Sequence, residues 1–187
     1  SKNTAMKTAG AVLAVCLAAA FFLTGIVFSL RPYSAVAALS ESRIVPVYRV
    51  DRDDKKIAIS FDAAWGSEKT MEILDILDRY HVKTTFFLVG FWIDAYPERT
   101  IQIAARGHEI GNHSTNHPNM PTLSAEQMAQ EIDETQEKIT KLTSQTPTLF
   151  RAPFGDYDNK LMSLLHEKGY EGIQWSIDSL DWKDIGT

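Results

Sequence analysis

The stretch IAISFDAAWGSEKTMEILDILDRY, residues 57–80, decides the fold class because its hydrophobic period changes part-way along. Residues 57–61 are mostly apolar and predict a buried strand. Ser67 is placed to cap a helix whose apolar residues then recur at helical spacing: Ile73, Ile76, Leu77 and Tyr80. A strand followed directly by a helix is the repeating unit of a parallel α/β sheet.

The same alternation continues along the chain. Further strands are predicted at 84–89, 109–111, 148–151 and 172–177. Helices are predicted from Pro97 to Gly107, from a capping box at 124–127 to about Leu142, and over 159–168. This order predicts an α/β fold with a parallel sheet, either doubly wound or closed as a barrel. No glycine-rich phosphate-binding motif follows a predicted strand, which argues against a nucleotide-binding domain.

The head of the chain is apolar. Residues 9–30 contain no charge and are long enough for a transmembrane helix. Lys2 and Lys7 precede this segment, so residues 1–8 are expected to be cytoplasmic and the chain after it exported. Its length favours an uncleaved anchor, while Ala-Val-Ala at 35–37 fits a signal-peptide cleavage site. Residues 31–49 are expected to form a linker, and residues 50–187 a folded domain.

The charge balance restricts the possible partners. The 187 residues carry 19 Lys and Arg against 24 Asp and Glu, a net charge of −5. The first 31 residues hold three bases and no acid, so the remainder carries −8. An acidic body without a basic cluster argues against nucleic-acid binding. Cys16 is the only cysteine, which excludes thiolate metal sites and cysteine nucleophiles from the exported part.

Polar residues with reactive side chains follow the predicted strands. They are Asp62, His113, His117, Arg151, Asp178 and Asp181. In a parallel barrel these positions share the rim where active sites are built. The two histidines are four residues apart, a spacing found in divalent-metal sites, and an Arg151 fork can hold the Asp62 carboxylate. Taken singly, each residue also has an ordinary explanation as a turn, cap or surface residue.

Four segments together carry a resemblance to a known family: Ser60-Phe-Asp62, His113-Ser-Thr-Asn-His117, Arg151-Ala-Pro-Phe-Gly155 and Asp178-Ser-Leu-Asp-Trp182. In this order and spacing they resemble the NodB-homology polysaccharide deacetylases, carbohydrate esterase family 4. The sequence FDAAWG at 61–66, with an apolar N-terminal segment, looks like the sporulation subgroup. The resemblance implies a distorted (β/α) barrel, incomplete in this chain, preceded by a transmembrane helix.

The resemblance also implies metal-dependent hydrolysis of N-acetyl groups on a cell-wall glycan such as peptidoglycan. Asp62 would be the general base, oriented by Arg151, and Asp181, with Asp178 as the alternative, would tune a general-acid histidine. His113 and His117 would hold a divalent metal ion, zinc first, with cobalt, nickel or manganese as alternatives. The backbone N–H of Phe154 would meet the oxyanion, and Trp65 and Trp182 would line the substrate groove.

Two departures from the family pattern put activity in question. The residue after the base, usually a second Asp that ligates the metal, is Ala63 here. The Leu-x-His motif that supplies the general acid is absent, and the chain is expected to be a fragment that lacks the last barrel strands. Two hypotheses follow: a membrane-tethered deacetylase, or a catalytically weakened glycan-binding or structural wall protein.

Overall fold

The computed structural model describes residues 42–183. The predicted cytoplasmic N-terminus, the apolar segment 9–30 and most of the linker lie outside the described residues. Within residues 42–183, no helix has the length and apolar character needed to cross a bilayer.

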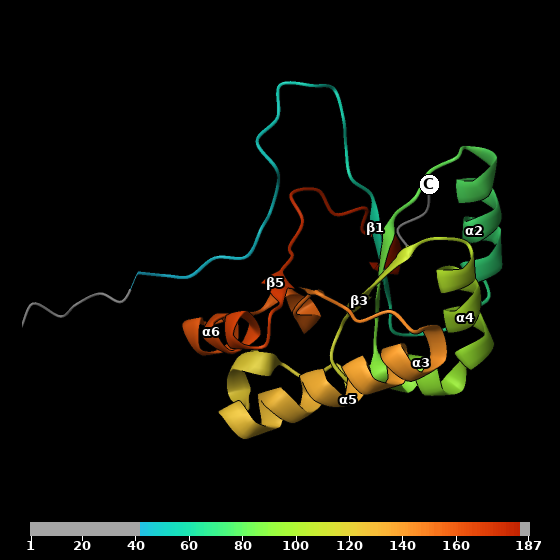
Figure 1. Cartoon of the computed structure of the whole chain (residues 1–187). Helices are drawn as coiled ribbons and strands as arrows, with labels where there is room; N and C mark the ends of the chain where they lie inside the picture. Colours follow the sequence, from blue (N-terminus) through green and yellow to red (C-terminus); the bar gives the residue numbers. More distant parts are fainter. Residues whose placement is uncertain (1–41, 184–187) are drawn as a thin grey trace, which may run out of the picture. The chain divides into compact units, whose positions relative to one another are not determined.

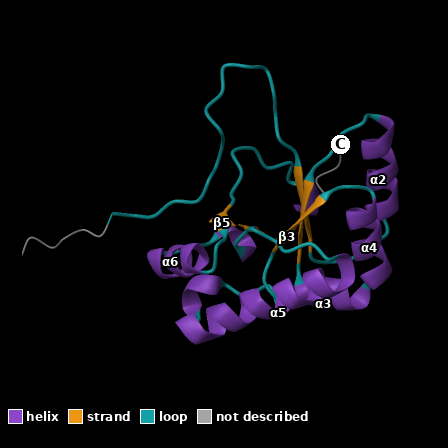
Figure 2. Ribbon diagram, in the orientation of Figure 1, coloured by secondary structure: helices purple, strands orange, loops and turns teal. Residues whose placement is uncertain are grey.

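Five parallel strands form a single sheet at the centre of the described unit (Figure 2). They are β1 (Ser60–Ala63), β2 (Thr85–Leu88), β3 (Glu109–Asn112), β4 (Leu149–Phe150) and β5 (Glu171–Gly172). Each strand pairs with the next one along the chain, in the order β1-β2-β3-β4-β5. A doubly wound sheet reverses its strand order part-way, whereas a β/α barrel keeps it sequential. The order therefore decides between the two predicted architectures in favour of the barrel type.

Helices form an outer layer around the sheet (Figure 1). They are α2 (Thr70–Arg79), α3 (Gly90–Ala95), α4 (Pro97–Ala105), α5 (Ala125–Thr143) and α6 (Asn159–Glu167). Helix α2 packs against α4, α4 against α5, and α5 against α6. Short 3₁₀ turns occupy Met120–Thr122, Pro153–Gly155 and Asp181–Lys183.

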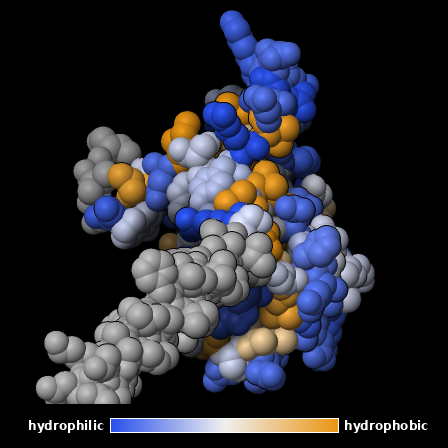
Figure 3. All heavy atoms as spheres, turned by 90° about the vertical axis from the view of Figure 1, so that its left-hand side faces the viewer, coloured by the Kyte–Doolittle hydropathy of each residue, from blue (hydrophilic) through white to orange (hydrophobic). Residues whose placement is uncertain are grey.

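Two hydrophobic clusters fill the space between helices and sheet. The first contains Trp92 and lies among β2, α2, α3 and α4; the second contains Phe150 and lies among β4, α5 and α6. Helix α5 contributes Ile139 to the first and Ile132 to the second. On the face seen in Figure 3, hydrophobic residues lie in small separate groups among hydrophilic ones.

Several predicted elements are correct and others need correction. The capping box of α5 is present: Ser124 Oγ accepts from the Gln127 amide, and the Gln127 side chain accepts from the Ser124 amide. Helix α2 is not capped by Ser67; it begins after Lys69, and the Thr70 amide donates to the Ser67 carbonyl. Helix α3 was not predicted from the sequence.

The last predicted strand, 172–177, is much shorter in the structure. Ladder pairing of β5 with β4 ends at Gly172, and Ile173 makes an isolated parallel bridge with Val47. At the other edge, Ser60 begins β1, and the Ile57 side chain that precedes it is 89% exposed. The predicted strand 57–61 is therefore shifted toward its carboxyl end.

Candidate active site

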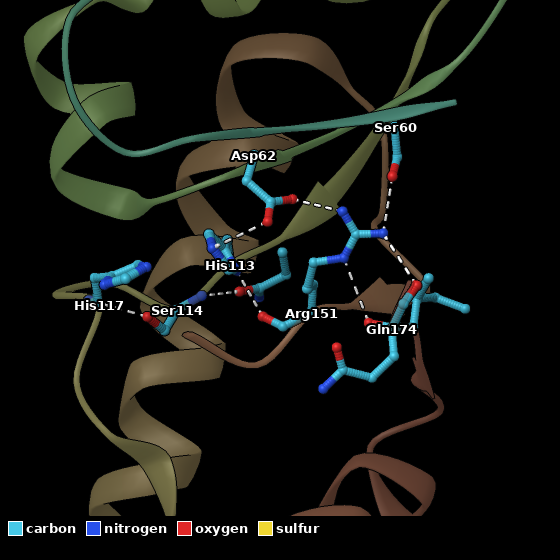
Figure 4. A network of polar contacts seen from close by, with 9 residues as sticks. Ser60, Asp62, His113, Ser114, His117, Arg151 and Gln174 are labelled. Carbon is cyan, nitrogen blue, oxygen red and sulfur yellow. Dashed lines mark hydrogen bonds and ion pairs between the residues drawn. The ribbon is translucent and has the colours of Figure 1, made fainter. Parts of the chain in front are cut away.

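Arg151, directly after β4, is the centre of the polar network at the carboxyl ends of the strands (Figure 4). Its side chain is buried, and Nη1 donates to Asp62 Oδ1 at 2.6 Å while Nη2 donates to Ser60 Oγ at 2.8 Å. The guanidinium lies over the Phe87 ring, with Cζ 4.0 Å from the ring centroid. This planar fork fixes the direction of the Asp62 carboxylate, as the sequence predicted.

His113, which follows β3, is held in one tautomer. Its Nδ1 lies 2.7 Å from the Arg151 carbonyl, which can only accept, so Nδ1 carries the hydrogen. Nε2 then faces Asp62 Oδ2 at 3.8 Å. Burial lowers the pKa of His113, and the Asp62 charge only partly offsets this. His113 is thus a neutral imidazole whose Nε2 lone pair points toward the base candidate.

His117 lies beside His113, with ring centroids 5.0 Å apart and the rings nearly perpendicular. Burial, and then the neighbouring His113, lower the pKa of His117 to about 4. Its backbone amide donates to Ser114 Oγ at 3.0 Å, which closes the loop between the two histidines. Both imidazoles are therefore neutral at neutral pH and lie side by side, as their spacing predicted.

Two exposed aromatic residues flank His117. The Trp65 ring lies 5.1 Å from the His117 ring and is 75% exposed; the Phe154 ring lies 4.7 Å away and is 67% exposed. We call Trp65, His117 and Phe154 the aromatic surface. Flat exposed rings of this kind can pack against the apolar faces of a sugar. Phe154 has a left-handed backbone, with φ of 60°.

Asp181 and Trp182 are not brought into this cluster by the contacts of residues 42–183. Asp181 Oδ1 accepts from Ser179 Oγ at 2.5 Å, and Trp182 lies under the Lys183 ammonium at 4.7 Å. Both side chains are exposed. Among residues 42–183, no hydrogen bond, ion pair or ring contact joins either side chain to Asp62, Arg151 or the two histidines, so their roles stay predictions.

Comparison with known proteins fits this geometry. A sequence profile described as polysaccharide deacetylase matches residues 49–173. The chain belongs to the polysaccharide deacetylase family. The predicted family is confirmed; its sporulation subgroup stays a prediction.

Individual relatives of this deacetylase-family chain include active enzymes and a pseudoenzyme. It is 37% identical over 135 residues to the peptidoglycan-N-acetylmuramic acid deacetylase PdaC of Bacillus subtilis, covering 72% of this chain and 28% of that protein. A CE4 family pseudoenzyme from Bacillus anthracis superposes with a TM-score of 0.73 at 33% identity, covering 75% of this chain and 50% of that one. A mutant of that pseudoenzyme with restored enzymatic activity superposes equally well, at 34% identity with 75% and 52% coverage. The chain spans about half the length of the first curated relatives it matches.

Deacetylases of this family are generally metal-dependent, and the side chains around Asp62 offer few metal ligands. His113 and His117 offer two imidazole nitrogens, and Ala63, next to Asp62, offers a methyl group. Among residues 42–183, no group of three His, Cys, Asp or Glu side chains could hold a metal ion. Protein zinc sites use three or four such ligands. The residues present therefore do not fit the expected metal.

The sequence did not predict Ser60, Gln174 or Glu131 as residues of the site. Ser60 has a recognisable signal, because it lies two residues before Asp62 and so on the same face of β1. The Gln174 amide donates to the Gly155 carbonyl at 2.6 Å and so holds the turn that carries Phe154. Glu131 reaches the loop between the two histidines from helix α5.

Proposed function

We propose that this protein binds an N-acetylated cell-wall glycan through a deacetylase-type site and has little or no deacetylase activity. The observation that carries the proposal is Ala63 beside Asp62, which leaves two imidazoles as the donor set. Two imidazoles without the second Asp of the family pattern bind a divalent ion weakly, so Lewis-acid activation of water is expected to be poor.

The aromatic surface supports the glycan-binding half of the proposal. Trp65 and Phe154 expose most of their ring area on either side of His117. The Trp65 loop is fixed, because the buried Trp92 Nε1 donates to the Gly66 carbonyl at 2.5 Å. A preorganised aromatic surface loses little side-chain entropy when it binds a sugar ring, which favours binding.

The second candidate is an active deacetylase, and the retained Asp62–Arg151 pair favours it. A carboxylate oriented by a buried guanidinium at 2.6 Å is placed to act as a base or an electrostatic stabiliser. Full activity in this case requires another metal ligand in place of the second Asp of the family pattern, because Ala63 stands at that position.

The deciding experiment compares the wild-type chain with Ala63→Asp. We expect wild type to bind chitotetraose, a linear tetramer of N-acetylglucosamine, and to release no acetate at saturating zinc. Ala63→Asp adds the third ligand, so it should take up one zinc ion and gain acetate release. Zinc-dependent acetate release by wild type that disappears in Asp62→Asn would establish the second candidate instead. If wild type shows neither chitotetraose binding nor acetate release, both candidates fail.

We also propose that the protein acts outside the cytoplasm, tethered through residues 9–30, and takes part in sporulation. The uncharged segment with preceding lysines supports the first part, and the FDAAWG sequence supports the second. Protease accessibility in intact cells, and the timing of expression during sporulation, test these two parts separately.

A further inference from the structure

The loop between the two histidines is anchored by a carboxylate that comes from helix α5. Glu131 Oε2 accepts from the Thr115 amide at 2.8 Å and from the Asn116 amide at 2.7 Å. Glu131 Oε1 accepts from the Asn116 side-chain amide, also at 2.7 Å. All three bonds go to the two residues nearest His117 within the loop. Hydrogen bonds to a carboxylate are about twice as strong as those between neutral groups, so this anchor is a strong one.

This loop requires an anchor because its backbone is strained on both sides of the contact. Ser114 has φ of 67° and His117 has φ of 53°, left-handed values that residues other than glycine rarely adopt. Such conformations cost roughly 1–3 kcal/mol each and persist only where the surroundings fix them. Glu131 holds the two residues that lie between these strained positions.

Other contacts orient the first half of the loop. The Gly90 amide donates to the Ser114 carbonyl at 2.9 Å, and Thr115 Oγ1 donates to the Glu131 carbonyl at 2.9 Å. Asn116 is exposed, and its amide and side chain both donate to Glu131. Asn116, next to His117, is therefore held by the Glu131 carboxylate, while the His117 amide donates to Ser114 Oγ.

We propose that Glu131 is a positioning residue that sets the direction of the His117 ring, and through it the shape of the aromatic surface. The ring of His117 lies between Trp65 and Phe154, at 5.1 and 4.7 Å, so a turn of the loop changes the shape of the whole surface. The effect on glycan binding rests on the function proposed above; the effect on the loop does not.

The test uses Glu131→Ala, Glu131→Gln and the control Glu134→Ala. Glu134 lies three residues further along α5, and its carboxylate accepts from Gln130 of the same helix. Glutamine keeps one acceptor oxygen but presents an NH₂ group toward the Asn116 amide, so Glu131→Gln should be intermediate. Unfolding in urea is measured for every variant, so that a general loss of stability is separated from the local effect.

The first measurement is amide hydrogen exchange at Thr115 and Asn116, together with the NMR signals of the His117 ring. We expect exchange to rise by about tenfold or more in Glu131→Ala, since a charge-assisted bond is removed from each amide. The His117 signals should shift in Glu131→Ala, less so in Glu131→Gln, and stay in place in Glu134→Ala. Unchanged exchange and unchanged ring signals in Glu131→Ala overturn the proposal.

The second measurement is affinity for chitotetraose by calorimetry. We expect Glu131→Ala to weaken binding by about fivefold or more, roughly 1 kcal/mol, and Glu134→Ala to leave it within about twofold. Equal losses in the two alanine variants overturn the link between Glu131 and the aromatic surface. If wild type does not bind chitotetraose, the proposed function fails, and the exchange rates and ring signals alone decide the role of Glu131.

Discussion

At the scale of single residues, Arg151 is the side chain on which the site depends most. It is buried, bonds Asp62 and Ser60 through separate nitrogens, and stacks on Phe87. Water can solvate the Asp62 carboxylate, whose side chain is 35% exposed, so Arg151→Ala should cost less than the loss of a fully buried ion pair: about 1–3 kcal/mol of the free energy of unfolding in urea titrations. Arg151→Lys should lie between, because an ammonium cannot reproduce the planar fork. A loss below about 1 kcal/mol in Arg151→Ala, the range of exposed pairs, would contradict this.

His108 gives a second prediction, about pH. Burial lowers its pKa from 6.5, as does the nearby Lys83 charge, and its buried Nε2 has no hydrogen-bond partner among the described residues. Below about pH 6.5, the His108 imidazole therefore binds a proton more readily in the unfolded chain than in the folded one. The free energy of unfolding is highest above that pH and decreases as the pH falls below it.

The variant His108→Asn isolates this effect, because its side-chain oxygen can replace the Nδ1 acceptor that the Thr84 amide uses. Urea unfolding at several pH values from 7 to 5 should show wild type losing more stability than His108→Asn. His166→Asn, at an exposed position on α6, should follow wild type. Parallel curves for wild type and His108→Asn would mean that His108 does not contribute to the pH dependence of stability.

At the scale of elements, Gly111 of β3 has no Cβ, and the Phe87 ring of β2 packs into the space that a Cβ would need. A Cβ added there would lie 2.4 Å from Cδ1 of the Phe87 ring, which is itself 1% exposed and supports the Arg151 guanidinium. Gly111→Ala should therefore cost about 1–3 kcal/mol of stability, as overpacking does. Gly169→Ala is the control: it has φ of +77° and open space, so backbone strain alone should cost about 1 kcal/mol. A smaller loss in Gly111→Ala than in Gly169→Ala would show that Phe87 can move aside.

The elements that the sequence predicts well are those with local signals. Helix α5 has its capping box and α4 begins at Pro97, and both lie where these residues predict. Helix α3 has no such signal, since its six residues continue an apolar strand and its first amide donates to Ser114, far along the chain. Tertiary contacts, which a local pattern does not contain, determine that helix.

The same distinction applies to the site. His113 and Arg151 are predictable because each directly follows a parallel strand, and parallel strands bring their carboxyl ends together. Asp62 is also expected after its strand, but it lies within β1, one residue before the strand ends. Glu131 is not predictable as a site residue, because its role depends on α5 crossing next to the histidine loop. Its one local signal is its place at the edge of the buried stripe of α5, four residues before Thr135.

At the scale of the whole described unit, helix α5 joins the two hydrophobic clusters. Its buried residues Met128, Ile132 and Ile139 lie on one face, with Ile132 in the second cluster and Ile139 in the first. A rigid helix shared by both clusters means that neither can lose its packing while the other keeps its own. The unit is therefore expected to unfold in one cooperative transition.

Ile132→Ala tests this cooperativity. Ile132 is fully buried, so its truncation should cost about 2–5 kcal/mol. Tryptophan fluorescence, to which the buried Trp92 of the first cluster contributes, and far-UV circular dichroism should report the same shifted midpoint in urea. Ile101→Ala, with a side chain 36% exposed on α4, should change stability by less than about 1 kcal/mol. If the dichroism of Ile132→Ala shows an earlier, separate transition while the fluorescence midpoint stays at the wild-type value, the two clusters fold independently and α5 does not couple them.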